Sequence, residues 1–246
     1  QDKWRPGFED EAYRRLHELT VKGQPVQRLI FWPEAAVTGP LEDGRRAARK
    51  LAEDERLRAT SAMGPGDLLL TGGLSLTSAD GVSVSGATNS VYALEPLGRI
   101  IGRYDKAHLV PYGEYLPMRP LLSKIGLSRL APGDIDFEDG PGPRTIQLPG
   151  EWGKVGFQLC YEIIFSGGVV DRRDRPDFIF NPSNDAWFGR WGPPQHLAQA
   201  RLRAAEEGLP VIRSTPTGIS ALIDPHGSVL DSILWRQAGM IDASLP

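Results

Sequence analysis

The chain has 246 residues, of which 40% are hydrophobic and 24% charged, as in an ordinary globular domain. Its net charge of −3 gives no sign of the strongly basic surface typical of nucleic-acid-binding domains, so we expect no nucleic-acid partner. No apolar run reaches the ~18 residues that span a bilayer, and the single cysteine excludes an internal disulfide. The length fits a single domain covering residues 1–246.

Two hydrophobic periods alternate along the chain, which is typical of a layered α/β domain. The first half predicts helices over 9–22 and 45–63 and strands over 26–32, 67–74, 90–94 and 100–104. The second half predicts strands over 155–160, 177–181, 210–214, 219–223 and 228–230, with a hairpin turn at 224–227. It also predicts a helix over 195–207 that ends at Gly208. We therefore expect a mixed, mostly buried sheet.

Residues 116–130 follow neither period. This segment contains apolar residues among prolines, one glycine and three basic residues: Leu116, Met118, Leu121, Leu122, Ile125, Leu127, Leu130, Gly126, Arg119, Lys124 and Arg129. One interpretation is a loop with a short helix packed on the core. The other is a mobile apolar lid whose basic residues suit lipid headgroups.

Three strand-like runs lead into residues with complementary chemistry. The run 29–33 leads into Glu34, the run 99–105 into Lys106 and the run 154–159 into Cys160. Together these side chains supply a general base, a cation that stabilises an oxyanion, and a thiol nucleophile. This set is the strongest functional signal in the sequence.

Each of the three residues also has a simpler interpretation. A lone cysteine is more often a small core residue, but the position of Cys160 favours a strand-to-helix elbow that exposes a nucleophile. Glu34 is either a solvated loop residue or a base whose pKa is raised by apolar neighbours in a turn made rigid by Pro33. Lys106 is either a surface residue or a buried cation that keeps the thiol ionised.

The segment 181–196 is rich in polar residues with ordinary structural uses. Ser183, Asn184 and Asp185 are typical turn and capping residues, and His196 is more often a structural histidine than a ligand. The four histidines are scattered and form no Cys/His pair with ligand spacing, so we expect no metal site. No glycine-rich phosphate loop is present either.

Glu34, Lys106 and Cys160 resemble the Glu-Lys-Cys triad of the nitrilase (carbon-nitrogen hydrolase) superfamily. Longer motifs are similar to those of the apolipoprotein N-acyltransferase family, and they lie at 32–34, 104–117, 160–165, 184–189, 195–197, 203–206 and 217–220. The resemblance covers nearly the whole chain. It implies an α/β fold of the four-layer αββα sandwich type and no cofactor.

The resemblance also implies a reaction. Cys160 would take a fatty acyl chain from a phospholipid as a thioester and pass it to the α-amino group of a diacylglyceryl-cysteine apolipoprotein. Glu34 would be the base and Lys106 the oxyanion stabiliser. The supporting or substrate-binding positions implied near them are Glu114, Tyr161, Glu162, Tyr112, Asn184 and Trp187.

In that family the domain lies on the periplasmic face of the bacterial inner membrane between transmembrane helices. We therefore expect the chain to be a segment of a membrane protein that lacks its first strand and those helices, with membrane contact aided by 116–130. Two positions depart from the family pattern, namely Pro216, where asparagine is common, and Ser166, where proline is common. The alternatives are a soluble amidase or nitrilase and a non-catalytic binding module.

Overall fold

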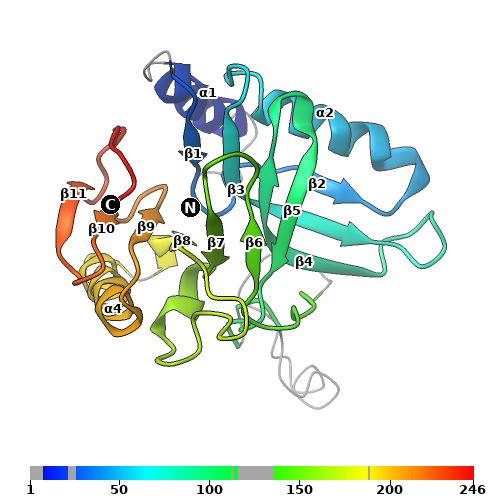
Figure 1. The fold of residues 1–246 in the computed structure, drawn as a ribbon. Helices are drawn as coiled ribbons and strands as arrows, with labels where there is room; N and C mark the ends of the chain where they lie inside the picture. The colour runs from blue at the N-terminus through cyan, green and yellow to red at the C-terminus, as the bar shows by residue number, and fades with distance from the viewer. Residues whose placement is uncertain (1–7, 22–25, 112, 116–135, 188) are drawn as a thin grey trace.

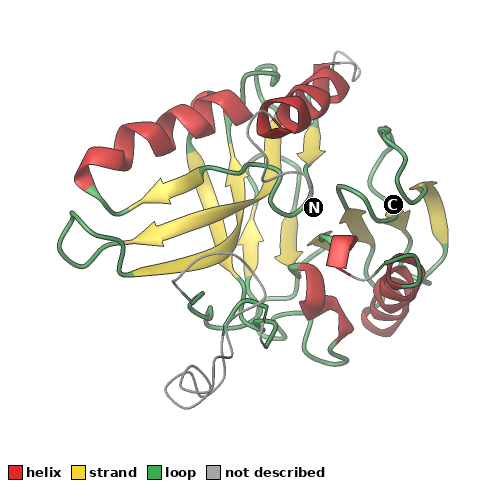
Figure 2. Ribbon diagram, turned by 180° about the vertical axis from the view of Figure 1, so that it is seen from behind, coloured by secondary structure: helices red, strands yellow, loops and turns green. Residues whose placement is uncertain are grey.

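The protein is described here from a computed structural model that covers residues 8–21, 26–111, 113–115, 136–187 and 189–246. Within these residues, the strands form a five-stranded and a six-stranded sheet. Figures 1 and 2 show helices at opposite sides of the molecule, with the sheets between them. The expected segment 116–130 lies outside the described residues.

The first sheet has the order β1-β3-β4-β5, and β2 pairs with β3. Its strands are β1 (Leu29–Phe31), β2 (Pro40–Asp43), β3 (Leu68–Thr77), β4 (Gly86–Leu94) and β5 (Ile100–Asp105). β1 and β2 run parallel to β3, whereas β4 is antiparallel to both of its neighbours. The central strands β3 and β4 are buried along most of their length because both faces of the sheet are covered.

The second sheet has the order β11-β10-β9-β8-β7-β6. Its strands are β6 (Thr145–Gln147), β7 (Lys154–Phe157), β8 (Phe178–Pro182), β9 (Val211–Ser214), β10 (Ser220–Ile223) and β11 (Val229–Ile233). The central strands β7, β8 and β9 are parallel, and the outer strands are antiparallel to their neighbours. Every residue of β8 is buried, in keeping with the apolar run Phe178–Phe180 at its start.

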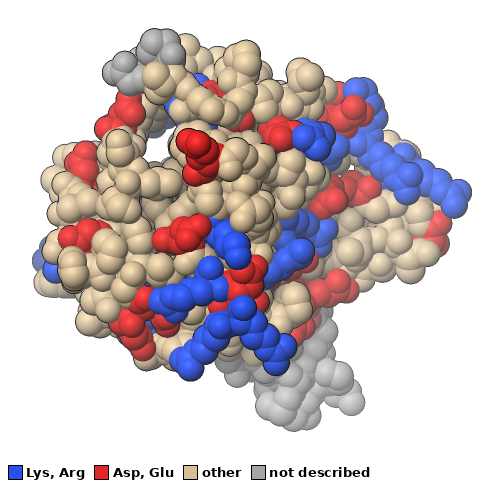
Figure 3. Space-filling model, viewed as in Figure 1, with Lys and Arg blue, Asp and Glu red and all other residues tan. Residues whose placement is uncertain are grey.

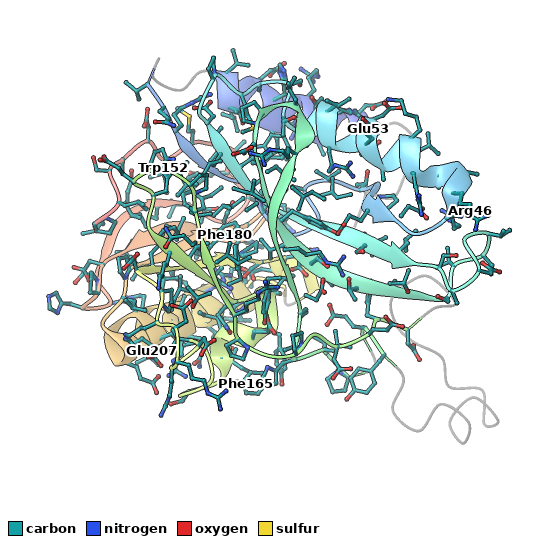
Figure 4. The ribbon with its side chains drawn as sticks, turned by 45° about the vertical axis from the view of Figure 1, so that its right-hand side comes forward. Arg46, Glu53, Trp152, Phe165, Phe180 and Glu207 are labelled. Atoms are coloured by element: carbon teal, nitrogen blue, oxygen red, sulfur yellow. The ribbon has the colours of Figure 1, made fainter. Side chains whose placement is uncertain are left out.

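Aromatic side chains fill the space between the two sheets. The ring of Phe31 in β1 lies 6.2 Å from that of Phe178 and 5.1 Å from that of Phe180, both in β8. Tyr104 in β5 stacks on Phe157 in β7 at 6.0 Å. Figure 4 shows Phe180 near the middle of the molecule. These contacts join the two sheets into one hydrophobic core.

Helices cover the outer face of each sheet. Apolar residues of α1 (Phe8–Val21) and the C-terminal end of α2 (Arg49–Ala59) pack on the first sheet. α4 (Gly192–Glu207) packs on the second sheet and ends at Gly208, whose φ of 62° is the left-handed value that glycine adopts without strain. The four-layer αββα sandwich expected from the sequence is therefore confirmed.

The element boundaries differ from the expected ones in places. The expected strand 26–32 is reduced to β1, and the helix expected over 45–63 begins with the 3₁₀ turn Arg46–Ala48 and ends at Ala59. The short strands β2 and β6 were not expected, because four polar-rich residues and three residues give too little pattern to detect. In the described part of the chain, no helix has the length and apolar character needed to cross a membrane.

Candidate active site

Glu34 lies in a tight turn directly after the first strand. The N–H of Trp32 donates to the carbonyl of Leu70 at 2.9 Å and extends the β1–β3 ladder, and the chain then turns through Ala35, whose φ is 50°. A Cβ on Gly72 of β3 would lie 2.7 Å from the Cα of Glu34, so only glycine lets the turn pack this closely. The carboxyl group is consequently buried against the sheet.

Lys106 directly follows β5. Its N–H donates to the carbonyl of Asn89 at 2.9 Å, and its own carbonyl accepts from the N–H of Gly140 at 2.8 Å. Its side chain is 1% exposed, and Nζ lies 2.9 Å from Oε1 and 2.8 Å from Oε2 of Glu114. Lys106 is therefore a buried cation and not a surface lysine.

Cys160 begins a 3₁₀ turn, Cys160–Ile164, beyond the end of β7. β7 ends at Phe157, earlier than expected, although the N–H of Gln158 still donates to the carbonyl of Phe180 at 3.0 Å. Cys160 has a φ of 52°, a left-handed conformation that is strained for a residue with a side chain. The expected elbow is therefore present and strained at the cysteine itself, but it does not expose the nucleophile, because Cys160 is buried.

Asn89 in β4 links the two carboxylates near the lysine. Its Nδ2 donates to Oε1 of Glu34 at 3.0 Å and to Oε1 of Glu114 at 2.9 Å. The other oxygen of Glu34, Oε2, is buried and has no hydrogen-bond partner among the described residues. An unpartnered carboxylate oxygen of this kind is well suited to accept a proton.

The charges around Lys106 keep it protonated. Burial lowers the pKa of this lysine, but the carboxylates of Glu34 and Glu114 and the neighbouring Cys160 raise it by more. The pKa of Lys106 therefore lies above its usual value. A permanently charged, buried ammonium group can stabilise negative charge that develops on a substrate oxygen.

The pKa of the Cys160 thiol is shifted in the opposite direction to the one expected. Burial raises the pKa of Cys160, the charge of Glu34 raises it further, and the opposing effect of Lys106 is smaller. The expectation that Lys106 keeps the thiol ionised is therefore wrong for this state. Since the thiol stays protonated, its attack on a substrate requires a base to remove the proton at the same time.

Glu162 ties the lysine loop to the cysteine turn. Its Oε1 accepts from the hydroxyl of Tyr104 at 2.7 Å and from the N–H of Ala107 at 2.7 Å, and its Oε2 accepts from the N–H of Leu159 at 2.8 Å. Burial raises the pKa of Glu162, and these hydrogen bonds offset only part of the effect. The carboxyl group therefore holds the loop after Lys106 and the turn at Cys160 together.

Of the other expected supporting residues, only some lie close to Cys160 in the described structure. The ring of Tyr161 packs edge-on against Phe165, with the centroids 5.1 Å apart. Asn184 is close to the nucleophile through its backbone, because its carbonyl lies 3.9 Å from Sγ of Cys160, while its side chain accepts from the N–H of Ala186. Trp187 ends the 3₁₀ turn Asp185–Trp187, but its side chain lies outside the described part, as does Tyr112.

Asn89 and Arg213 were not anticipated from the sequence. Arg213 is fully buried in β9 and donates two hydrogen bonds to the carboxylate of Asp185, at 2.8 and 2.7 Å. An arginine within the apolar run 210–214 was an available signal, because such a charge is rarely buried without an acidic partner. Asn89 gave no comparable signal.

Among the described residues, no three His, Cys, Asp or Glu side chains are grouped so that they could hold a metal ion. Two surface hollows, one lined by Asp67 and Trp152 and one by Arg46 and Glu53, contain none of the candidate residues. Figure 3 shows acidic and basic side chains interspersed on the face in view.

A sequence model of the carbon-nitrogen hydrolase family matches residues 13–246. The chain belongs to this family. It is 39% identical over 220 residues to the apolipoprotein N-acyltransferase of Bradyrhizobium diazoefficiens, which covers 89% of this chain and 39% of that protein. The apolipoprotein N-acyltransferase of Rhizobium rhizogenes is 35% identical over 226 residues, or 92% of this chain and 41% of that protein. The chain thus spans about two fifths of the length of these relatives.

Solved structures share the nitrilase-type fold. An amidase from Nesterenkonia sp. AN1, with an acetamide moiety covalently added at its active-site cysteine, matches with a TM-score of 0.62 and 16% identity over 96% of this chain and 84% of that chain. Nit3 of Saccharomyces cerevisiae matches with a TM-score of 0.63 and 17% identity over 93% of this chain and 82% of that chain. The chain is therefore a nitrilase-superfamily domain related to apolipoprotein N-acyltransferases.

Proposed function

We propose that this domain is the catalytic part of an apolipoprotein N-acyltransferase. It would move a fatty acyl chain from a phospholipid, through a thioester on Cys160, to the N-terminal α-amino group of a diacylglyceryl apolipoprotein. The observation that carries the proposal is the buried set of Cys160, Glu34 and Lys106 in a domain related to enzymes of that name. The set provides a nucleophile, a base and a cation without any cofactor.

In the first half-reaction, the Sγ of Cys160 attacks the ester carbonyl carbon of the phospholipid while Oε2 of Glu34 takes the thiol proton. Lys106 stabilises the negative charge on the carbonyl oxygen of the tetrahedral intermediate. The ester C–O bond then breaks, and the leaving alkoxide takes the proton from Glu34 to give a lysophospholipid. The raised pKa of Cys160 supports this order, because the thiol is not ionised beforehand.

In the second half-reaction, the neutral α-amino group of the acceptor attacks the thioester carbon. Glu34 takes a proton from the attacking nitrogen, and Lys106 again stabilises the oxyanion. The C–S bond breaks, the amide is released, and the thiolate recovers its proton from Glu34. Asn89 and Glu114 support both steps because they hold Glu34 and Lys106 in place.

The substrates imply a location. Both the acyl donor and the lipoprotein acceptor are held in a bilayer, so the full-length enzyme would work at the periplasmic face of the bacterial inner membrane. Transmembrane helices outside this chain and a lid formed by residues 116–130 would bring the domain to its lipid substrates. Neither feature lies in the described part of the chain.

The direct test is acyl transfer by the full-length enzyme in phospholipid vesicles with a diacylglyceryl lipopeptide as acceptor. We expect the lipopeptide to gain one amide-linked acyl chain on its α-amino group, and Cys160→Ala to abolish the gain. Turnover of small amides without lipid, with no lipopeptide acylation, would instead favour a soluble amidase or nitrilase, the class of the structural neighbours. Acylation that persists in Cys160→Ala would contradict the thioester route.

A further inference from the structure

A second buried charged cluster lies next to the nucleophile turn. It consists of Asp185 from the 3₁₀ turn after β8, His196 from α4 and Arg213 from β9, with side-chain exposures of 0%, 7% and 0%. Arg213 donates to both oxygens of Asp185, and Nδ1 of His196 lies 2.8 Å from Oδ1 of the same carboxylate. The acyl-transfer steps above use none of these groups.

The cluster reaches the nucleophile through the histidine. Nε2 of His196 lies 3.0 Å from the carbonyl oxygen of Cys160. Both contacts are made to oxygen atoms that act as acceptors, a carboxylate and a backbone carbonyl. His196 therefore bridges Asp185 and the backbone of Cys160.

The aspartate is fixed from several sides. Burial raises the pKa of Asp185, but the hydrogen bond from His196 and the charge of Arg213 lower it by more, so the group remains a carboxylate. A Cβ on Gly218 would lie 2.1 Å from Oδ2, which shows how closely the backbone before β10 packs on this carboxylate. Arg213 in turn donates to Oδ1 of Asn181 at 2.6 Å. The carboxylate that holds the ring of His196 is consequently fixed in position.

A rigid bridge matters at this position because Cys160 is strained. Its φ of 52° lies in the left-handed region, which a residue with a side chain adopts only when its surroundings hold it. The hydrogen bond from His196 is made to the carbonyl of this same residue. It therefore restrains the backbone of Cys160 and, with it, the position of Sγ.

We infer that His196 is a positioning residue, which holds the carbonyl of Cys160 so that the thiol is aimed at the acyl donor. The inference rests on the proposed role of Cys160 as nucleophile. His196 touches neither substrate nor reacting atoms, and it acts only through the backbone of the cysteine. Asp185 and Arg213 orient its imidazole ring.

A purely structural role is the alternative, because α4 also contacts this turn elsewhere. Arg203, seven residues further along α4, donates from Nη1 to the carbonyl of Ile164 at 3.2 Å. Arg203 and His196 thus both join α4 to the same 3₁₀ turn, but only His196 bonds to the nucleophile residue. Arg203→Met is therefore a matched control, because it removes a hydrogen bond between α4 and this turn without touching Cys160.

The test compares two amide variants of the full-length enzyme in phospholipid vesicles. The amide nitrogen of His196→Gln reaches approximately the position of Nε2, toward Cys160, whereas that of His196→Asn reaches approximately the position of Nδ1, toward Asp185. The rate of acyl-enzyme formation in a single turnover, its dependence on phospholipid concentration and the midpoint of thermal unfolding are measured for both variants and for Arg203→Met.

We expect His196→Asn to slow acyl-enzyme formation by about 10²-fold at saturating phospholipid, because a misaimed nucleophile affects the chemical step and not donor binding. His196→Gln should remain within about 10-fold of the unmodified enzyme, because it retains a donor to the carbonyl. Arg203→Met should lower the unfolding midpoint with little change in rate. This pattern would support the positioning role.

Equal rates for the Gln and Asn variants would overturn the inference, as would losses of rate that simply follow the unfolding midpoint across all three variants. Cys160→Ala, measured in parallel, separates this failure from failure of the proposed function. If Cys160→Ala still forms an acyl-enzyme, the nucleophile assignment fails. If only Cys160→Ala is inactive and the His196 variants behave like Arg203→Met, the positioning role alone fails.

Discussion

At the scale of single residues, the main feature is a nucleophile that is neutral at rest. Burial raises the pKa of Cys160 and Glu34 adds to the effect, whereas many catalytic cysteines have a lowered pKa. Glu34 therefore has two consequences: it disfavours the free thiolate, and it is placed to take the proton when a substrate is attacked. A resting thiol of this kind reacts slowly with adventitious electrophiles.

This account predicts the pH dependence of alkylation. The rate at which iodoacetamide alkylates Cys160 in the folded enzyme should rise with a midpoint above the ~8.5 of a free cysteine, because the pKa is raised. Glu34→Gln removes a negative charge that raises this pKa, so the midpoint should move to lower pH. The same substitution should slow acyl-enzyme formation by about 10²- to 10⁴-fold, because the base is lost. A midpoint below 8.5 in the unmodified enzyme, or one that rises in Glu34→Gln, would contradict the account.

The buried Asp185–Arg213 pair makes a separate prediction about stability. Asp185→Asn keeps the side-chain volume but leaves the guanidinium of Arg213 without its counter-charge in a fully buried site. We expect the free energy of unfolding to fall by about 3–5 kcal/mol, measured by urea denaturation. The exposed Asp231→Asn is the control, and its effect should be within about 0.5 kcal/mol. Similar effects for the two variants would show that the pair contributes little.

The sequence indicated which reactive residues the candidate site brings together, but not the hydrogen bonds that hold them. Glu34, Lys106 and Cys160 could be singled out because their side chains are reactive and follow apolar runs. Asn89 could not be singled out, because its role depends on contacts with Glu34 and Glu114, which lie 55 and 25 residues away in the sequence. The raised pKa of the Cys160 thiol could not be predicted either, because it depends on how completely the sulfur is buried.

At the scale of elements, two strained turns lie beside the candidate site. Ala35, next to Glu34, and Cys160 itself both have left-handed φ values, 50° and 52°. Neither is glycine, so the surrounding packing must hold both turns. Strand β3 does so for the first turn through the close contact between Gly72 and the backbone of Glu34.

Gly72→Ala tests the support of the first turn. The added Cβ would lie 2.7 Å from the Cα of Glu34, so the turn must shift and change the position of the base. We expect acyl-enzyme formation to slow by about 10-fold or more. Gly64→Ala is the control, because its Cβ would meet no atom closer than 3.7 Å. Equal single-turnover rates for the two variants would contradict the role assigned to this contact.

The prediction of elements succeeded where a pattern was long enough. The apolar runs that became β3, β4 and β8 and the periodic segment that became α4 were located to within a few residues. The short strands β2 and β6 were missed, because their pairing with β3 and β7 depends on tertiary context. The arrangement into two facing sheets came from the resemblance to a known family and not from periodicity.

At the scale of the whole molecule, the candidate site is assembled from both sheets. Glu34 and Lys106 follow strands of the first sheet, and Cys160 follows a strand of the second. Their relative placement therefore depends on the core between the sheets, where Phe180 packs against Phe31 and Phe157. This dependence links the stability of the sandwich to the geometry of the site.

Phe180→Ala tests that dependence. Phe180 is fully buried, so its truncation should lower the free energy of unfolding by about 3–5 kcal/mol through lost burial and a cavity between the sheets. Urea denaturation measures the loss, and Leu51→Ala, at an exposed position of α2, provides the comparison. A loss below about 1 kcal/mol would contradict the central position of this ring in the core.

The most direct test of the central claim is the intact mass of the full-length enzyme after incubation with phospholipid in the absence of an acceptor. The account predicts a gain of one acyl group that hydroxylamine removes, and no gain in Cys160→Ala. An acyl group that resists hydroxylamine, or one that also appears in Cys160→Ala, would contradict a thioester on Cys160. The absence of any gain while small amides are hydrolysed would contradict the acyltransferase proposal itself.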